Sequence, residues 1–398
     1  MIVYSKNSVF DESLNRLRYL FDEFNDVVVS FSGGKDSTVI LELALRVAEE
    51  KGRLPLKVLF LDQEAEWECV IDYVRRVMND PRVEPIWLQI PLKMPNSSSG
   101  KEQHLICWEQ GKESEWIRPK EPMAISENTF GTEDFYKLFT EIARSLFSAS
   151  TCYISGVRTE ESPGRKLGLC EGIPTYKWIT WGKVLNKGIK HYTFYPIYDW
   201  SYTDVWKFIH DNELNYCKLY DYMYQRRIPI QEMRVSCVLH ETATRSLFFL
   251  QEVESDTWNR ICKRVSGVNT TSVLKNNSIS APKELPYMFE SWEEYRDYIV
   301  ENIILCENLK KRIKNFIKNN NVFEMSKENC LLRVKLSKVC INAMLRNDVD
   351  FTILKNIMSS PIISTYRKWK QGKILTHELK KPNKYIQYEI NKNHNQSG

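Results

Sequence analysis

Closely spaced cysteine pairs are missing from this sequence. Its ten cysteines are scattered over 398 residues, and no C-x-x-C occurs among them. Dense pairs are typical of disulfide scaffolds, zinc ribbons and iron–sulfur sites, so we expect no iron–sulfur cluster and no zinc. The one suggestive pair, Cys237 with His240 in CVLH, lacks partners at a matching spacing. Reduced and mostly buried thiols are the expected state.

Long hydrophobic runs are missing as well. No stretch approaches the roughly 18 apolar residues that a membrane helix needs. The start, MIVYSKNSVFDESLNRLRYL, lacks the basic-then-apolar order of a secretory signal. We therefore expect a cytoplasmic protein that has no membrane partner. The content of 42% apolar and 27% charged residues is ordinary for a globular chain, and the length allows more than one domain.

Acidic residues are scarce in the last quarter of the chain. Residues 301–398 carry 19 Lys and Arg against 8 Asp and Glu, an excess of +11, whereas the remainder has a net charge of −6. A basic segment of this kind suits a polyanionic partner such as a nucleic acid. Lysines on solvated helix faces are equally compatible with the count.

Short β-branched apolar runs alternate with amphipathic segments in the first half of the chain. The pattern predicts strands over 27–31, 56–62, 83–90 and 151–158, and helices over 36–52, 66–80, 135–147 and 202–214. Short links between them indicate right-handed crossovers. The predicted fold class is therefore α/β, a parallel twisted, Rossmann-like sheet flanked by helices.

Strand patterns fade after about residue 230. We predict three parts: an α/β nucleotide-binding domain over 1–230, a mostly helical basic extension over 231–380 and a loose polar tail over 381–398. Residues 91–132 are rich in Pro, Ser and Gly, and they are predicted to form a long binding loop or lid.

The segment VVVSFSGGKDSTVIL (27–41) ends a strand in two glycines and begins a helix at once. Glycine lets backbone amides approach an anion closely, and a helix N-terminus adds free N–H groups and a positive partial charge. Hydroxyl donors and a full positive charge come from Ser32, Ser37 and Lys35. The spacing fits neither G-x-x-x-x-G-K-[ST] nor G-x-G-x-x-G. We predict a phosphate cradle of another kind.

SFSGGKDS (30–37) resembles the PP-loop, SGGxDS, of the adenine-nucleotide alpha-hydrolases. Three further blocks are similar, in the same order, to the phosphoadenosine phosphosulfate (PAPS) reductase and sulfotransferase branch: VLFLDQEAEW (58–67), SGVRTEESPGR (155–165) and YPIYDWSYTDVWKFI (195–209). Residues 233–272 also resemble bacterial proteins labelled phosphoadenosine phosphosulfate sulfurtransferase, many of which are encoded beside a ParB-like nuclease.

The resemblance implies a transferase whose substrate is an adenine nucleotide, ATP or PAPS. It implies that the phosphates or phosphosulfate are held by Ser32, Gly33, Gly34, Lys35, Asp36 and Ser37. It places Asp62 near ribose hydroxyls or a metal ion, and assigns nucleotide oxygens to Gly156, Arg158 and Arg165. The implied catalytic residues are Lys35, Asp36 and Arg158. Asp36, itself an anion, is expected to cap the helix or to reach a Mg²⁺ ion.

One departure from the branch concerns the catalytic thiol. Its reductases attack the sulfuryl group with a cysteine in a C-terminal Glu-Cys-Gly tail, and no cysteine follows Cys340 here. A thioredoxin-linked reductase is therefore not expected, and Cys152 and Cys237 are the remaining candidate nucleophiles.

Three kinds of function stay open. The first is transfer of an adenylyl or sulfuryl group. The second is a nucleic-acid-directed role, either sulfur modification of DNA or tRNA or defence with a nuclease, in which Trp369 of YRKWKQGK would stack on a base. The third is a nucleotide sensor without turnover.

Overall fold

The computed structural model describes most of the chain: residues 6–96, 104–170, 174–186, 188–230, 233–235, 237–239, 247–265, 268, 281–304, 306–345, 348, 351–379 and 382–396. Over these residues no helix combines the length and the apolar character that crossing a bilayer requires. Contacts between residues divide the chain into two units. The first comprises residues 1–94, 106–238 and 249–264, and the second comprises the remainder.

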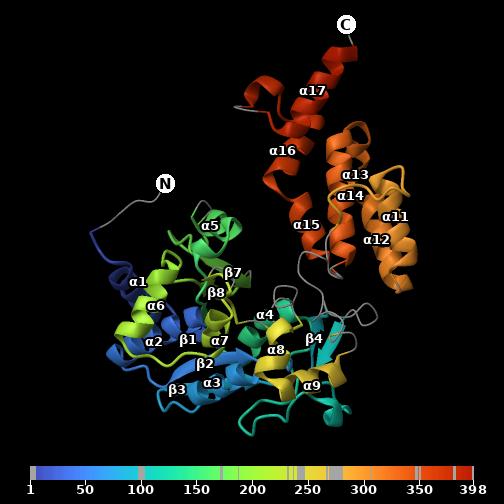
Figure 1. Ribbon diagram of the computed structural model, residues 1–398. Coiled ribbons are helices and arrows are strands. Elements are labelled where there is room, and N and C mark those ends of the chain that lie inside the picture. Colours follow the sequence, from blue (N-terminus) through green and yellow to red (C-terminus); the bar gives the residue numbers. More distant parts are fainter. Residues whose placement is uncertain are drawn as a thin grey trace. The chain divides into compact units, whose positions relative to one another are not determined.

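A six-stranded sheet is the centre of the first unit (Figure 1), with the strand order β3-β2-β1-β6-β8-β7. Its strands are β1 (Asp26–Ser30), β2 (Leu56–Leu61), β3 (Val83–Leu88), β6 (Ser150–Ile154), β7 (Gly182–Asn186) and β8 (Lys190–Phe194). All neighbouring strands are parallel except β7 and β8. The short strands β4 (Leu92–Pro95) and β5 (His104–Cys107) form a separate two-stranded sheet.

The strand order changes direction at β1. From β1 the chain proceeds outward to β2 and β3, and it returns on the other side of β1 as β6. At such a switch point the loops after the two strands diverge and leave a crevice at the carboxyl edge of the sheet, where open α/β sheets bind ligands. The residues after β1 and after β6 are those predicted to hold the nucleotide.

Burial on both faces explains the continuous apolar sequence of β1. Val27, Val28 and Val29 are all buried, and Val29 pairs with Val58 on one side and Ile154 on the other. A strand covered on both faces has no polar face, so its sequence does not alternate. The predicted parallel α/β fold is confirmed.

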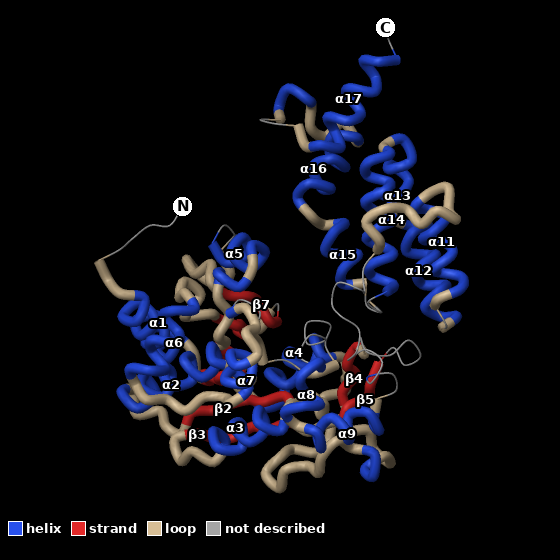
Figure 2. Tube along the Cα trace, in the orientation of Figure 1, coloured by secondary structure: helices blue, strands red, loops and turns tan. Residues whose placement is uncertain are grey.

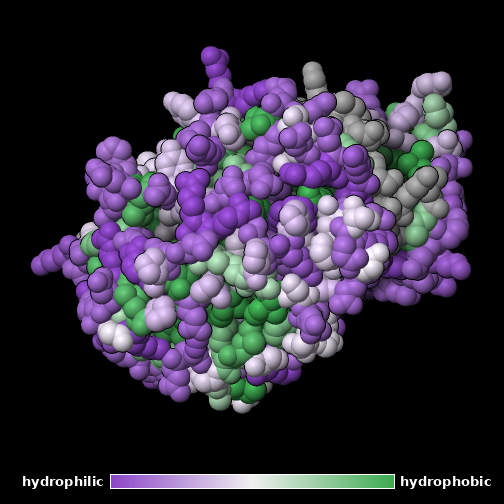
Figure 3. Space-filling view, turned by 90° about the horizontal axis from the view of Figure 1, so that it is seen from below, coloured by the Kyte–Doolittle hydropathy of each residue, from purple (hydrophilic) through white to green (hydrophobic). Residues whose placement is uncertain are grey.

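Helices cover the sheet (Figure 2). Those of the first unit are α1 (Val9–Glu23), α2 (Lys35–Glu50), α3 (Glu68–Met78), α4 (Phe135–Leu146), α5 (Pro163–Cys170), α6 (Tyr202–Asp211), α7 (Leu219–Gln225), α8 (Leu247–Val253) and α9 (Ser255–Arg264). Helix α2 packs against α1 and α6, and α3 packs against β3. With the apolar residues of the strands enclosed in this way, hydrophilic residues cover most of the face seen in Figure 3.

The described part of the predicted loop 91–132 contains short regular elements and a few buried side chains. It contains β5 and a short 3₁₀ helix over Glu113–Glu115, and Trp108 and Ile117 are almost completely buried. These buried residues hold the segment at a few positions, whereas residues 110–115 are exposed, and a lid stays a prediction. Residues 97–103 of the same prediction lie outside the described part.

The second unit is helical. Its longer helices are α11 (Trp292–Asn302), α12 (Glu307–Asn319), α13 (Asn321–Met325), α14 (Cys330–Leu345), α15 (Thr352–Met358), α16 (Pro361–Lys370) and α17 (Lys384–Gln396). Leu332, Leu336, Tyr366 and Ile386 are central members of its core.

Two predicted boundaries differ from this arrangement. Helix α9 belongs to the first unit, although the α/β domain was expected to end at residue 230, because Ile261 is fully buried and Arg264 pairs with Glu64. The prediction of a loose tail over 381–398 is wrong for α17, because Ile386 on that helix is completely buried.

Candidate functional site

The turn from β1 into α2 is tightly closed. Gly33 has a φ of 72°, which favours glycine, and a Cβ there would lie 3.0 Å from Cγ1 of Val70. Gly34 is the N-cap of α2. The Ser37 hydroxyl accepts from the backbone N–H of Ser32 at 3.3 Å and donates to the carbonyl of Gly34 at 2.8 Å. The predicted donor Ser37 thus holds the shape of the turn.

Several backbone donors of this turn have no acceptor among the residues that the structure describes. Within the part of the chain that the structure describes, the N–H groups of Gly33, Gly34, Asp36 and Ser37 meet no acceptor. The first N–H groups of any helix lack an intrahelical partner, and they carry the positive end of the helix dipole. The turn therefore presents a group of amides that suits an anion.

Lys35, Asp36 and Arg158, the predicted catalytic residues, lie together. The Lys35 Nζ is 3.1 Å from a carboxylate oxygen of Asp36, and Arg158 donates from Nε to the other oxygen at 2.6 Å. Lys35 also donates to the carbonyl of Met233 at 3.4 Å. Asp36 therefore bridges two cations. It does not cap α2, because Gly34 occupies the N-cap position.

Gly156 allows the segment after β6 to approach α2. A Cβ at this position would lie 2.6 Å from the carbonyl carbon of Asp36 and 2.7 Å from its oxygen. Arg158 follows two residues later, and it donates further to Glu160 at 2.8 Å and to the carbonyl of Trp200 at 3.2 Å. The absence of a side chain at position 156 thus brings Arg158 to Asp36.

Arg165 is connected to this group through Glu161. Its guanidinium pairs with one oxygen of Glu161, and the other oxygen accepts the backbone N–H of Arg158 at 2.9 Å. The Arg165 side chain is 40% exposed, compared with 4% for Arg158. Arg165 is therefore the more available of the two predicted arginines, and no contact between it and the turn is present among the described residues.

Asp62 lies at the carboxyl edge of the sheet, as predicted, but it is fully buried. Oδ1 accepts from Arg118 and from the backbone N–H of Glu64, and Oδ2 accepts from Trp87 and Gln89, both at 2.9 Å. A carboxylate offers about four lone-pair positions. The predicted contact of Asp62 with ribose or a metal ion is not supported, because four protein donors already bind its carboxylate.

Glu64 continues this buried network. It lies at a φ of 61°, an uncommon value for a residue other than glycine. Its carboxylate accepts from the backbone N–H of Trp108 at 2.6 Å, from that of Ile117 at 3.2 Å and from Arg264 Nε at 3.0 Å. The network holds the end of β2 to residues far away in the sequence.

Glu66 lies beside these carboxylates, and it is 5% exposed. Burial, and then the charge of Asp62, raise the pKa of Glu66 to about 8. The carboxyl group therefore holds a proton through much of the neutral range. No local pattern distinguishes this acid from a solvated acid at a helix start.

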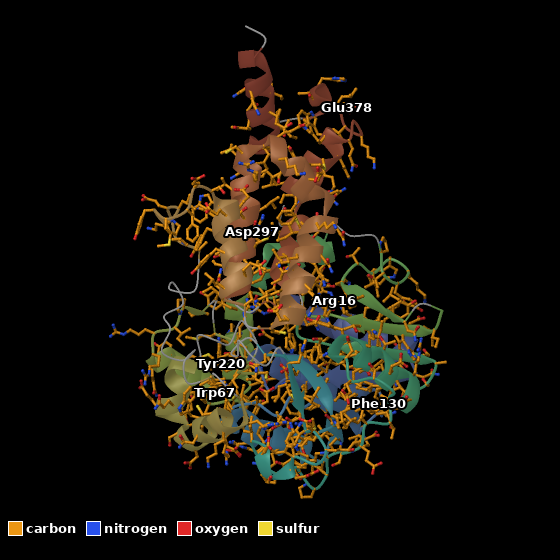
Figure 4. All side chains as sticks on the ribbon, turned by 90° about the vertical axis from the view of Figure 1, so that its right-hand side faces the viewer. Arg16, Trp67, Phe130, Tyr220, Asp297 and Glu378 are labelled. Atoms are coloured by element: carbon orange, nitrogen blue, oxygen red, sulfur yellow. The ribbon has the colours of Figure 1, made fainter. Side chains whose placement is uncertain are left out.

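Tyr220 is a further residue at the turn that sequence reasoning missed. It comes from α7 and is labelled in Figure 4. Its hydroxyl accepts the backbone N–H of Lys35 at 3.0 Å, across 185 residues of sequence. Nothing in the pattern of the short α7 segment distinguishes this tyrosine from its neighbours.

The candidate thiols are poorly placed for nucleophilic attack. Cys152 in β6 is fully buried, and burial raises the pKa of its thiol well above the ordinary value. Cys237 is also buried, at 3% exposure, and His240 lies outside the described residues. Among the residues that the structure describes, no group of three Asp, Glu, His or Cys side chains is arranged to hold a metal ion.

Two residues of the basic segment 366–373, Trp369 and Lys370, make contacts within the second unit. The indole N–H of Trp369 donates to Thr376 at 3.0 Å, and Lys370 pairs with Glu328 at 2.6 Å and with Glu389 at 2.7 Å. Nucleic-acid binding stays a prediction.

The chain is similar to two protein families and to several known proteins. The model of the phosphoadenosine phosphosulfate reductase domain matches residues 26–227, and a domain of unknown function (DUF3440) matches residues 227–370. The uncharacterized protein YbdN of Escherichia coli is 29% identical over 305 residues, which cover 72% of this chain and 73% of that protein. An adenosine 5'-phosphosulfate reductase of Lysinibacillus sphaericus is 22% identical over 271 residues, which cover 67% of this chain and 95% of that protein.

Among solved structures, the PAPS reductase of Candida auris in its phosphate complex matches at 14% identity. The match covers 56% of this chain and 93% of that one, with a TM-score of 0.32, which is too low to add to the topology described above. The family model, in contrast, spans just over half of the chain and includes every residue of the turn. The predicted resemblance is confirmed, and the chain belongs to the phosphoadenosine phosphosulfate reductase domain family.

Proposed function

We propose that the protein binds an adenine nucleotide with its anionic tail on residues 32–37, and that it transfers an adenylyl or sulfuryl group to an acceptor. One observation carries the proposal: amides of the turn that have no acceptor among the described residues lie, with the Lys35 ammonium group, at the N-terminus of the 16-residue helix α2. The names of the relatives support it, since they include adenosine 5'-phosphosulfate reductases and subunit 2 of sulfate adenylyltransferase.

Adenylyl transfer from ATP is the first candidate reaction. An acceptor oxygen would attack the α-phosphorus, the bond from that phosphorus to the bridging oxygen would break, and pyrophosphate would leave. The turn supports this step because its amides and Lys35 would stabilise the negative charge that grows on the leaving group. In sulfuryl transfer from PAPS, an acceptor oxygen would instead attack the sulfur and form a new S–O bond, the bond between sulfur and the bridging oxygen would break, and adenosine bisphosphate would leave from the same turn.

The burial of the two candidate cysteines, Cys152 and Cys237, favours a reaction that uses neither of their thiolates. A reactive cysteine needs access to solvent and a lowered pKa. Cys152 has neither, because it is fully buried and its pKa is raised, and Cys237 is also buried. Group transfer to an acceptor is therefore favoured over reduction of a sulfonucleotide by one of these thiols.

Mg²⁺ is not supported as a resident cofactor by the described residues. Asp36, the predicted ligand, directs one carboxylate oxygen to Arg158 and the other to Lys35. Mg²⁺ is usually bound by one or two free carboxylates together with substrate phosphates and water, and both oxygens of Asp36 already contact a cation. The described residues also contain no group of three candidate ligands. We therefore derive no step through a metal ion held by the protein.

A nucleotide panel tests the proposal. ATP, adenosine phosphosulfate and PAPS are titrated by calorimetry, and AMP, pyrophosphate and adenosine bisphosphate are measured as products. Lys35→Ala should weaken binding of the preferred nucleotide about 10-fold or more, because a hydrogen bond to a charged group contributes about 1.5–3 kcal/mol. Lys51→Ala, at the exposed C-terminal end of the same helix, is the matched control.

Two results would contradict the proposal. If no nucleotide binds to the wild-type protein, the nucleotide site is wrong. If a nucleotide binds and no product exceeds the Lys35→Ala background with any acceptor tried, including small alcohols, sulfate and tRNA, a sensor without turnover replaces the enzyme.

A further inference from the structure

The hydroxyl of Tyr220 lies at the first N–H of α2. It accepts the Lys35 N–H at 3.0 Å, and a Cβ on Gly34 would lie 3.3 Å from the same oxygen. The hydroxyl is therefore next to the amides of Gly34 and Asp36, which have no acceptor among the described residues. A phenol oxygen from a distant helix thus lies within the group of donors that suits an anion.

The tyrosine ring is held in place. Tyr220 is 3% exposed, its ring meets the Trp206 ring edge-on at 5.4 Å between centroids, and the Lys35 ammonium lies 5.2 Å from the ring centroid. Aromatic edge contacts and a nearby cation both favour this position. A side chain buried on several sides does not leave its site easily when a ligand arrives.

The hydroxyl proton of Tyr220 is available. A phenol can donate one hydrogen bond while it accepts others, and the oxygen here accepts from Lys35 while the described residues offer no acceptor for its proton. Burial, followed by the nearby charge of Asp36, raises the pKa of Tyr220 well above its ordinary value. The group therefore keeps its proton throughout the physiological range.

We propose that Tyr220 is a positioning residue for the nucleotide's anionic tail: its oxygen accepts the Lys35 N–H, and its proton is donated to a phosphate or sulfate oxygen that the neighbouring amides also bind. The inference rests on the proposed nucleotide site, and it adds to that site a donor from a helix outside the PP-loop. The alternative is that the hydroxyl occupies the place of a ligand oxygen and must be displaced.

The test uses Tyr220→Phe, which keeps the ring and removes only the hydroxyl. Tyr216→Phe is the matched control, since the Tyr216 hydroxyl bonds to Asp221 on the exposed side of the same segment. Each protein is titrated with ATP and with adenosine, which lacks the phosphates. We expect Tyr220→Phe to bind ATP about 10-fold more weakly, to bind adenosine as the wild type does, and the control to match the wild type with both.

Each other outcome overturns the inference. Tighter ATP binding by Tyr220→Phe would mean that the hydroxyl obstructs the site. Equal weakening for ATP and adenosine would mean that the residue is structural, and unchanged ATP binding would mean that it is not involved. If the wild type binds PAPS and not ATP, PAPS replaces ATP in these titrations. If the wild type binds no nucleotide of the panel, the proposed function is overturned, and this inference with it.

A second measurement is independent of the folding of that variant. With 3-fluorotyrosine in place of Tyr220, the fluorine resonance should shift when ATP is added and remain in place when adenosine is added. A resonance that responds equally to both ligands, or to neither, would contradict a contact with the phosphates.

Discussion

The close approach between Gly156 and α2 makes Gly156→Ala the most direct perturbation of the site. The added Cβ would lie 2.6 Å from the carbonyl carbon of Asp36 and 2.7 Å from its oxygen, and both are backbone atoms that cannot rotate away. Overpacking of this kind costs about 1–3 kcal/mol, whereas the smaller conformational freedom of alanine in the unfolded chain returns about 0.4–1 kcal/mol. The expected net loss of stability is about 1–2 kcal/mol.

Two assays measure this effect. In urea unfolding, a loss of that size lowers the midpoint by about 0.5–1 M for a slope of about 2 kcal/mol per M. In ATP titration, affinity should fall about 10-fold, because the first turn of α2 has to move away from Arg158. Gly164→Ala in α5 is the control, since no atom lies within 4 Å of its added Cβ. If Gly156→Ala unfolds at the wild-type midpoint and binds ATP with wild-type affinity, the steric reasoning is wrong.

Three further predictions concern the buried groups. Because the pKa of Glu66 is raised to about 8, the folded state keeps a proton that the unfolded state loses above about pH 4.5. The free energy of unfolding should therefore decrease as the pH rises from about 4.5 to about 8, by up to about 4 kcal/mol. In Glu66→Gln, urea midpoints measured over that range should change less with pH. Asp62→Asn should cost about 3–5 kcal/mol, because it leaves the buried Arg118 without its carboxylate, while the ATP affinity of the folded protein changes little; a large selective loss of affinity would restore a ligand role. Ile386→Ala should lower the free energy of unfolding of the second unit by about 2–4 kcal/mol. The control Gln387→Ala, at an exposed position, should lower it by less than about 0.5 kcal/mol. Equal urea midpoints for the two variants would show that α17 does not pack as described.

Local patterns predicted the elements that depend on a short stretch of chain. The run of valines in β1 and the glycines that follow it predict a strand, a turn and a helix, because burial on both faces and a positive φ each restrict the residue types within a few positions. Local patterns did not predict helix α17. Its sequence is polar on average, and only contacts with other helices show that Tyr385 and Ile386 are core residues.

The sequence by itself determined the α/β class, the family and the place of the turn that we propose binds an anion, because these depend on residues that are neighbours in the chain. Only the tertiary structure decided what surrounds the turn. The partners of Asp36, Lys35 and Asp62 come from Arg158, Tyr220 and Arg118, which are 122, 185 and 56 residues away. Periodicity describes how a segment packs against the core, but it does not specify which distant side chain pairs with a buried charge. The distant partners are what gave Asp62 a structural role and placed Tyr220 at the turn before α2.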